Sequence, residues 1–137
     1  MKANVITYQP ANAKLAKLAA SLAAKLGRRA HIYGISLPAG WSCPAAKDCK
    51  SKADRKTGKI TDGPDTQFRC FMASIEAFSH GARESAWRNF DALRTAKTLD
   101  GMLALLQAGL PKNADVVRID VDGDFFNQTY FDACLQL

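Results

Sequence analysis

The stretch of sequence that decides the fold class is AHIYGISL, at residues 30–37. Its β-branched and aromatic side chains alternate along the chain, which is typical of a β-strand. A second such run, VVRIDV at residues 116–121, places three aliphatic side chains on one face and Arg118 and Asp120 on the other. The two runs predict two strands of a small sheet.

Helical periodicity surrounds these two strands. Residues 13–26 carry leucines three and four positions apart, and Gly27 follows as a common helix terminator. Since helices separate the strands along the chain, the pattern favours an α/β fold with a small, mostly parallel sheet and flanking helices. The remaining expected elements are a short strand at 4–8 and helices at 67–79, 83–96, 99–110 and 128–137.

The whole chain, residues 1–137, is predicted to be a single domain, because 137 residues of which 47% are hydrophobic suffice for one core. This apolar fraction excludes intrinsic disorder. No run of about 18 apolar residues is present to span a bilayer, so no membrane association is expected. The first residues also lack the apolar core of a secretory signal, which predicts a cytoplasmic protein.

The net charge of +6 is distributed unevenly. Residues 1–47 contain seven basic side chains and no acid, whereas residues 114–137 contain one base and five acids. A basic front half attracts polyanions, so nucleic acid is a candidate partner. The lysines between residues 47 and 59, however, lack the interleaved aromatic side chains of single-strand binding, and a solvated surface is the simpler interpretation.

A long loop at about residues 38–66 has no periodicity and is rich in cysteine and lysine. Cys43 and Cys49 lie in this loop, directly after the strand at 30–37, and Cys70 lies near the start of the next helix. Three thiolates so placed can bind a metal centre, which would order a loop that has little apolar content. The nearby basic residues would favour thiolates over thiols. These residues are Lys47, Lys50 and Arg69.

The spacing of these cysteines discriminates between metals. A C-x5-C pair does not have the spacing of a zinc knuckle, whereas iron–sulfur clusters tolerate more varied spacing. An iron–sulfur cluster is therefore predicted, with zinc as the alternative and metal-free buried cysteines as the simplest interpretation. A fourth ligand stays open between Cys134, His31 and His80, although the helical position of Cys134 beside aromatic residues favours the core.

Three aspartates follow the last predicted strand, namely Asp120, Asp122 and Asp124. Ligands of open α/β sheets gather at the carboxyl ends of strands, so these side chains are predicted to bind a cofactor. For Asp124, capping of the following helix is the simpler interpretation.

Several short words of the sequence occur together in one order. They are SLPAG at 36–40, SCP at 42–44, AKDC at 46–49, TGKITDGP at 57–64, QFRC at 67–70, VRI at 117–119 and GDFF at 123–126. In this order they resemble the bacteriophage gene product 88 family, from about residue 35 to the C-terminus. That family is distantly similar to radical-SAM proteins, in which three cysteines after an early strand hold a 4Fe–4S cluster.

The resemblance implies a phage protein, in the cytoplasm of the infected bacterium, that binds a 4Fe–4S cluster through Cys43, Cys49 and Cys70. A redox or radical-SAM-like role follows, with S-adenosylmethionine as a further cofactor and a small molecule as the partner at the cluster. The alternative is a non-enzymatic protein, zinc-bound or metal-free, that acts on host nucleic acid or a host protein. Whether the protein is an enzyme stays open.

The chain departs from the family pattern at three positions. Asp120 and Asp122 stand where His and Ser are expected, and Cys134 stands where Trp is expected. If these positions face the site, its chemistry is altered. The chain also ends soon after the GDFF word, which suggests a partial, half-barrel version of the fold that could dimerise.

Overall fold

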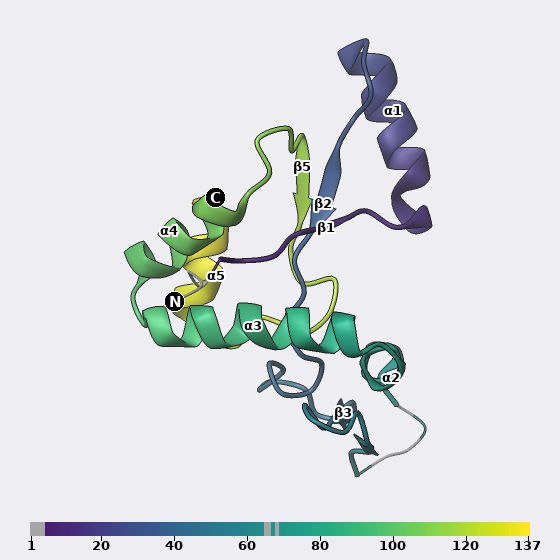
Figure 1. Ribbon diagram of the computed structural model, residues 1–137, viewed down its shortest axis with the longest axis vertical. Coiled ribbons are helices and arrows are strands. Elements are labelled where there is room, and N and C mark those ends of the chain that lie inside the picture. Colours follow the sequence, from purple (N-terminus) through teal and green to yellow (C-terminus); the bar gives the residue numbers. More distant parts are fainter. Residues whose placement is uncertain (1–4, 65–66, 68) are drawn as a thin grey trace.

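The computed structural model describes residues 5–64, 67 and 69–137. Within these residues the chain forms a mixed α/β fold with five α-helices, a sheet of three strands and a second sheet of two strands (Figure 1). None of the helices in this described part is both long and apolar enough to cross a membrane.

The larger sheet has the strand order β1-β2-β5, formed by β1 (Gln9–Pro10), β2 (Ile32–Gly34) and β5 (Val116–Arg118). β2 and β5 run parallel, as expected, but β1 is antiparallel to β2. The prediction of a mostly parallel sheet is therefore wrong, and the sheet is mixed. The physical reason is that the helix after β1 does not cross a face of the sheet, and parallel pairing requires such a crossover.

The first strand also lies later than predicted. Val5 to Tyr8 are not in a strand, and Asn4 lies outside the described residues. The strand predicted at 30–37 is confirmed in its centre only, as β2.

Hydrogen bonds between the segments after β2 and β5 continue the parallel pairing, but the segment after β5 contains one extra residue. The amide of Ile35 donates to the Arg118 carbonyl (3.1 Å), and the amide of Val121 donates to the Ile35 carbonyl (2.9 Å). Regular parallel pairing would use Asp120 as the second donor. Asp120 instead adopts a φ of 51°, so the β5 chain carries a bulge where the site was predicted.

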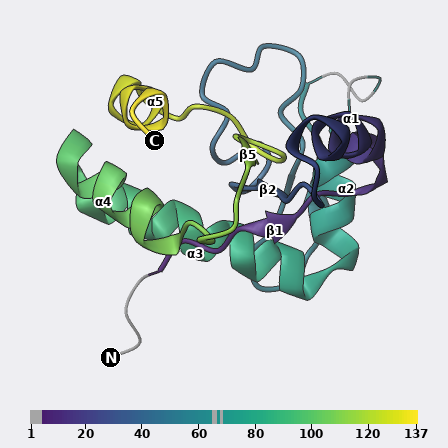
Figure 2. The same ribbon diagram turned by 90° about the horizontal axis from the view of Figure 1, so that it is seen from above.

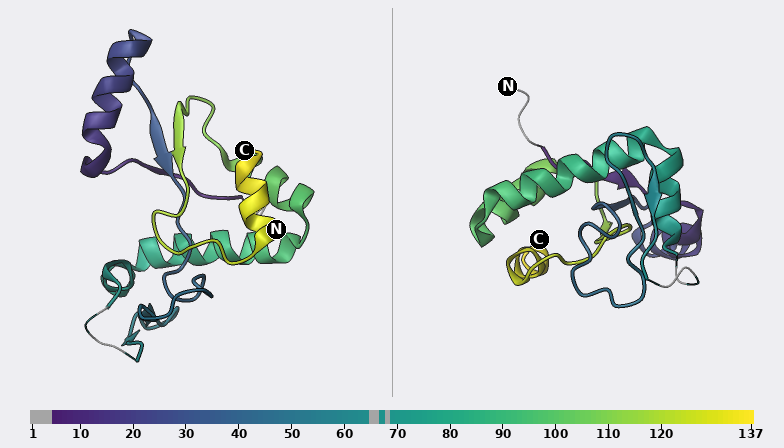
Figure 3. Two further views of the ribbon diagram at one scale, coloured as in Figure 1. Left: turned by 180° about the vertical axis from the view of Figure 1, so that it is seen from behind. Right: turned by 90° about the horizontal axis from the view of Figure 1, so that it is seen from below.

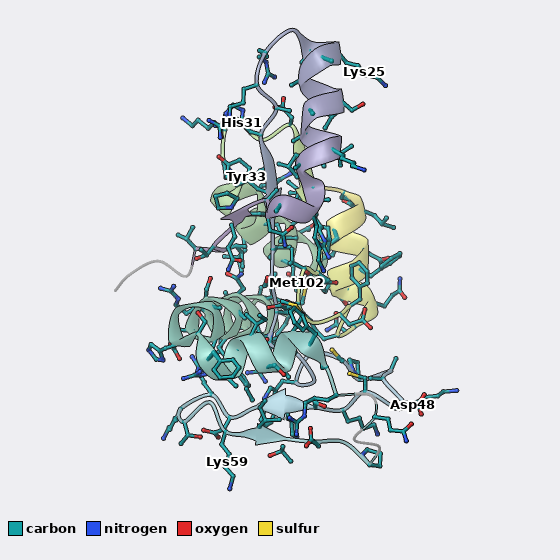
Figure 4. The ribbon with its side chains drawn as sticks, turned by 90° about the vertical axis from the view of Figure 1, so that its right-hand side faces the viewer. Lys25, His31, Tyr33, Asp48, Lys59 and Met102 are labelled. Atoms are coloured by element: carbon teal, nitrogen blue, oxygen red, sulfur yellow. The ribbon has the colours of Figure 1, made fainter. Side chains whose placement is uncertain are left out.

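The helix predicted at 13–26 is confirmed, as a 3-10 turn η1 (Ala13–Leu15) followed by α1 (Ala16–Leu26) and Gly27 in the left-handed conformation. Its leucine stripe is not buried, because α1 stands apart from the other helices (Figures 1 and 4). Arg28, just after α1, forms a bidentate ion pair with Asp115, just before β5, with contacts of 2.6 and 3.0 Å.

The other four helices lie close to their predicted positions. They are α2 (Phe71–Phe78), α3 (His80–Ala96), α4 (Leu99–Gly109) and α5 (Gln128–Leu135). α3 runs along one end of the sheet, with α4 and α5 on one side and α2 on the other (Figures 2 and 3). The core lies between these helices and the sheet, and it includes Ile6, Ile35, Leu37, Trp87, Phe90, Leu93, Met102, Leu106 and Tyr130.

The loop at 38–66 is less irregular than predicted. It contains a two-stranded antiparallel hairpin of β3 (Lys52–Ala53) and β4 (Ile60–Thr61), while residues 65 and 66 lie outside the described part. The Asp54 carboxylate organises the turn by accepting hydrogen bonds from the amides of Lys56 (3.0 Å) and Thr57 (2.7 Å). Such side-chain-to-backbone bonds are the usual means by which aspartate forms a turn.

Candidate metal centre

The segment after β2 leads the chain through the interior to Cys43. Ser36, Leu37 and Ala39 are all buried, and Ser42 is fully buried with its hydroxyl donating to the Pro38 carbonyl (2.9 Å). The amide of Cys43 then donates to the Gly40 carbonyl (3.4 Å). Cys43 therefore follows a rigid, buried turn at the carboxyl end of β2, where it was predicted to lie.

A hydrogen bond to Ser51 brings Cys70 close to the segment that carries Cys49. The Cys70 amide, at the N-cap of α2, donates to the buried Ser51 hydroxyl at 3.2 Å. Cys49 lies only two residues before Ser51 in the chain. This contact brings the start of α2 beside the segment that carries Cys49.

The electrostatics of the thiols show that Cys70 neighbours both other cysteines. Burial raises the pKa of Cys43, and the charges of Asp124 and Cys70 add smaller increases. Burial and contact with Cys70 likewise raise the pKa of Cys49. All three side chains are partly exposed and reduced. Within the described residues, no three His, Cys, Asp or Glu side chains converge on one point as ligands of a single ion do.

The basic residues do not act as the sequence suggested. The Arg69 guanidinium is committed to the Asp62 carboxylate, with a 2.7 Å contact from Nε, and the pKa values of Cys43 and Cys49 are raised rather than lowered. The basic side chains of residues 1–59 are also spread over the molecule, since Lys25 and Lys59 lie at its opposite ends (Figure 4). They therefore do not form a single surface around the cysteines.

The three predicted cofactor-binding aspartates face three different places. The Asp120 carboxylate accepts a hydrogen bond from the Tyr130 hydroxyl (3.0 Å), and burial raises its pKa to about 6. Asp122 is 6% exposed, and burial also raises its pKa to about 6, against the opposing charge of Arg118. Asp124 is exposed and is the aspartate whose charge acts on Cys43.

Asp124 does not cap the next helix, so that interpretation is wrong. Its carboxylate accepts from the adjacent Phe125 amide (2.7 Å), and the N-cap of α5 is Asn127, which accepts from the Tyr130 amide (2.8 Å). The charge of Asp124 nevertheless acts on Cys43, one of the predicted metal ligands.

The candidate fourth ligands lie in other surroundings. Cys134 packs against the core beside Tyr130, in keeping with the core position favoured by the sequence. His31 lies 3.7 Å from the Asp115 carboxylate, and His80 contacts the Arg83 guanidinium at 3.3 Å.

Sequence reasoning missed a buried acid beside this site. Glu76 is fully buried on α2, and its Oε1 accepts a hydrogen bond from the Ala39 amide at 2.8 Å. Burial raises its pKa to about 7, opposed by the Ala39 amide, with the charge of Asp122 adding to the increase. The available signal was one acid within the otherwise apolar α2 sequence FMASIEAF.

The family model of gene product 88 matches residues 6–137. The chain belongs to the gene product 88 family. Neither a curated protein nor a solved structure matches it. The match begins at residue 6, so it also covers α1, whereas the resemblance found from the sequence began at about residue 35. The distant similarity to radical-SAM proteins stays a prediction.

Proposed function

We propose that this gene product 88 protein binds an iron–sulfur cluster through Cys43, Cys49 and Cys70, at the carboxyl end of β2. The observation that carries the proposal is the position of Cys70. Its amide is bonded to Ser51, two residues after Cys49, and its charge acts on the thiols of both Cys43 and Cys49, although it lies at the start of α2, many residues further along the chain.

The chemistry of the donor set fits such a cluster. Thiolates are the ligands that iron–sulfur clusters use, and each thiolate binds a different iron. The three sulfurs thus need not converge on one point, as zinc would require with Zn–S distances of about 2.3 Å. Because burial raises the pKa values of Cys43 and Cys49, cluster binding would release protons and weaken as the pH falls.

When bound through these three cysteines, a 4Fe–4S cluster would supply electron transfer and could bind a small molecule such as S-adenosylmethionine. In this proposal Cys43, Cys49 and Cys70 hold the cluster, and the exposed Asp124 carboxylate faces what binds beside Cys43. Asp120 and Asp122 are not part of this binding surface, because their carboxylates face Tyr130 and the interior.

Anaerobic purification tests the proposal directly. We expect a brown protein that contains iron and acid-labile sulfide in similar amounts. Each of Cys43→Ser, Cys49→Ser and Cys70→Ser should reduce the iron content by more than about tenfold, since a lost ligand costs more than a lost outer-shell contact.

Cys134→Ser is the matched control and should retain the cluster, because Cys134 packs against the core. If the three variants keep the wild-type iron content, or if zinc replaces iron in every preparation, the proposal fails. A metal-free protein that binds heparin and DNA with strong salt dependence would favour the non-enzymatic alternative.

A further inference from the structure

Glu76 connects the two segments that carry the proposed cluster ligands. It lies six residues after Cys70, on the helix that Cys70 begins, and its Oε1 holds the Ala39 amide four residues before Cys43. It is fully buried, and its second oxygen, Oε2, has no hydrogen-bond partner among the residues that the structure describes. The side chain therefore positions the turn before Cys43 relative to the start of α2.

A second buried acid, Asp122, reaches the same interior from the segment after β5. Its backbone carbonyl accepts a hydrogen bond from the Leu37 amide (3.0 Å). The residue is 6% exposed, and within the described part of the chain its Oδ1 is also buried without a partner. Asp122 and Glu76 are therefore bonded to the same short segment, at Leu37 and Ala39, and the charge of Asp122 also acts on Glu76.

The surrounding cations do not bond to either orphaned oxygen. The Arg83 guanidinium, from α3, donates to the carbonyls of Glu76 (2.6 Å) and Arg55 (2.8 Å) and contacts His80. The charge of Arg83 acts on the Glu76 carboxyl and lowers its pKa, and the charge of Arg118, from β5, does the same to Asp122. Two carboxylates so buried cannot both ionise at low cost. A proton held by one of the two carboxyls makes that group neutral and removes this cost.

We propose that Glu76 and Asp122 form a buried carboxyl pair that holds one proton at neutral pH and, through the Ala39 amide, positions the turn that carries Cys43. Glu76 is thus a positioning residue for the proposed cluster site. The importance of this role rests on the proposed function, but the pair itself is a property of the metal-free protein. When the last proton leaves at alkaline pH, repulsion between the carboxylates loosens the turn.

Carboxyl carbon shifts measured by NMR on the metal-free protein test the pair. We expect Glu76 to titrate with a midpoint near pH 7. In Asp122→Asn the Glu76 midpoint should fall, because the neighbouring negative charge is gone. In Glu84→Gln, which alters a half-exposed carboxyl on α3, the Glu76 midpoint should stay unchanged. A Glu76 midpoint near the ordinary value of about 4.3 would overturn the proposal.

The positioning role has a separate readout in the Ala39 amide. Hydrogen exchange of this amide, corrected for its intrinsic pH dependence, should become faster in the wild type above pH 7. Glu76→Gln keeps the acceptor and cannot ionise, so its protection should not change with pH. Glu76→Ala should lose the protection at every pH. If Glu76→Gln and the wild type respond to pH alike, the pair does not control the turn.

These measurements separate the two proposals. A normal carboxyl titration in a protein that binds iron would overturn the pair and leave the cluster intact. A protein without iron that shows the coupled titration would overturn the cluster and leave the pair intact.

Discussion

Replacement of Asn89 by alanine is expected to lower the free energy of unfolding by about 3 kcal/mol or more. The fully buried Asn89 side chain accepts from the Thr7 amide (2.8 Å) and donates to the carbonyls of Thr7 (3.0 Å) and Ser36 (3.1 Å). Each buried group that loses its partner costs about 1–3 kcal/mol. These bonds join α3 to the N-terminal segment and to the end of β2, so the loss affects the whole core.

Urea unfolding of the metal-free protein at fixed pH measures this difference. Asn113→Ala is the matched control, because Asn113 is exposed and its side chain accepts a hydrogen bond from the Tyr33 hydroxyl at the surface. We expect that variant to lie within about 1 kcal/mol of the wild type. Similar losses for the two variants would mean that the Asn89 network does not anchor the N-terminal segment. A domain with a total stability of about 5–15 kcal/mol tolerates few such losses.

The parts of the fold that could be predicted depend on local periodicity. The leucine spacing and Gly27 predict α1, and alternation predicts β2, the centre of the strand expected at 30–37, and β5, the first half of the strand expected at 116–121. The direction of β1 could not be predicted, because local periodicity does not say whether the helix between two strands returns the chain parallel or antiparallel to the first; α1 runs beside β2 and leads back into it antiparallel to β1 (Figure 1). The exposure of the α1 leucines could not be predicted either. A stripe of leucines predicts an apolar helix face but not which element covers that face.

The part of the candidate site that depends on neighbouring strands could be predicted from the sequence. Parallel pairing of β2 and β5 brings their carboxyl ends together, and this puts Asp124 near Cys43. The separate directions of the three aspartates could not be predicted, because they depend on the bulge at Asp120. Alternation assigns faces only while a strand stays regular. Glu76 and Asn89 were missed since their bonding partners lie many residues away in the sequence.

Replacement of Gly123 by alanine is expected to cost about 3 kcal/mol of stability and to disturb the candidate metal centre. Gly123 has a φ of 78°, a left-handed conformation that costs other residues about 1–2 kcal/mol. An added Cβ would also lie 2.3 Å from the Ser42 hydroxyl oxygen and 2.8 Å from the Leu37 carbonyl oxygen. The Leu37 carbonyl is a backbone group in the core and cannot rotate away. Either the segment after β2 or the segment after β5 must therefore move, which typically costs about 1–3 kcal/mol more.

Gly27 separates the two parts of this cost. It also has a positive φ, 66°, but a Cβ at that position would meet no atom within 4 Å. Gly27→Ala should therefore cost only about 1 kcal/mol and leave iron binding unchanged, whereas Gly123→Ala should lower stability further and reduce iron binding. The second effect follows because Gly123 lies beside Asp124 and packs on Ser42, the residue before Cys43. Equal destabilisation by the two variants would show that backbone conformation alone matters at Gly123, and that the segments after β2 and β5 can separate freely.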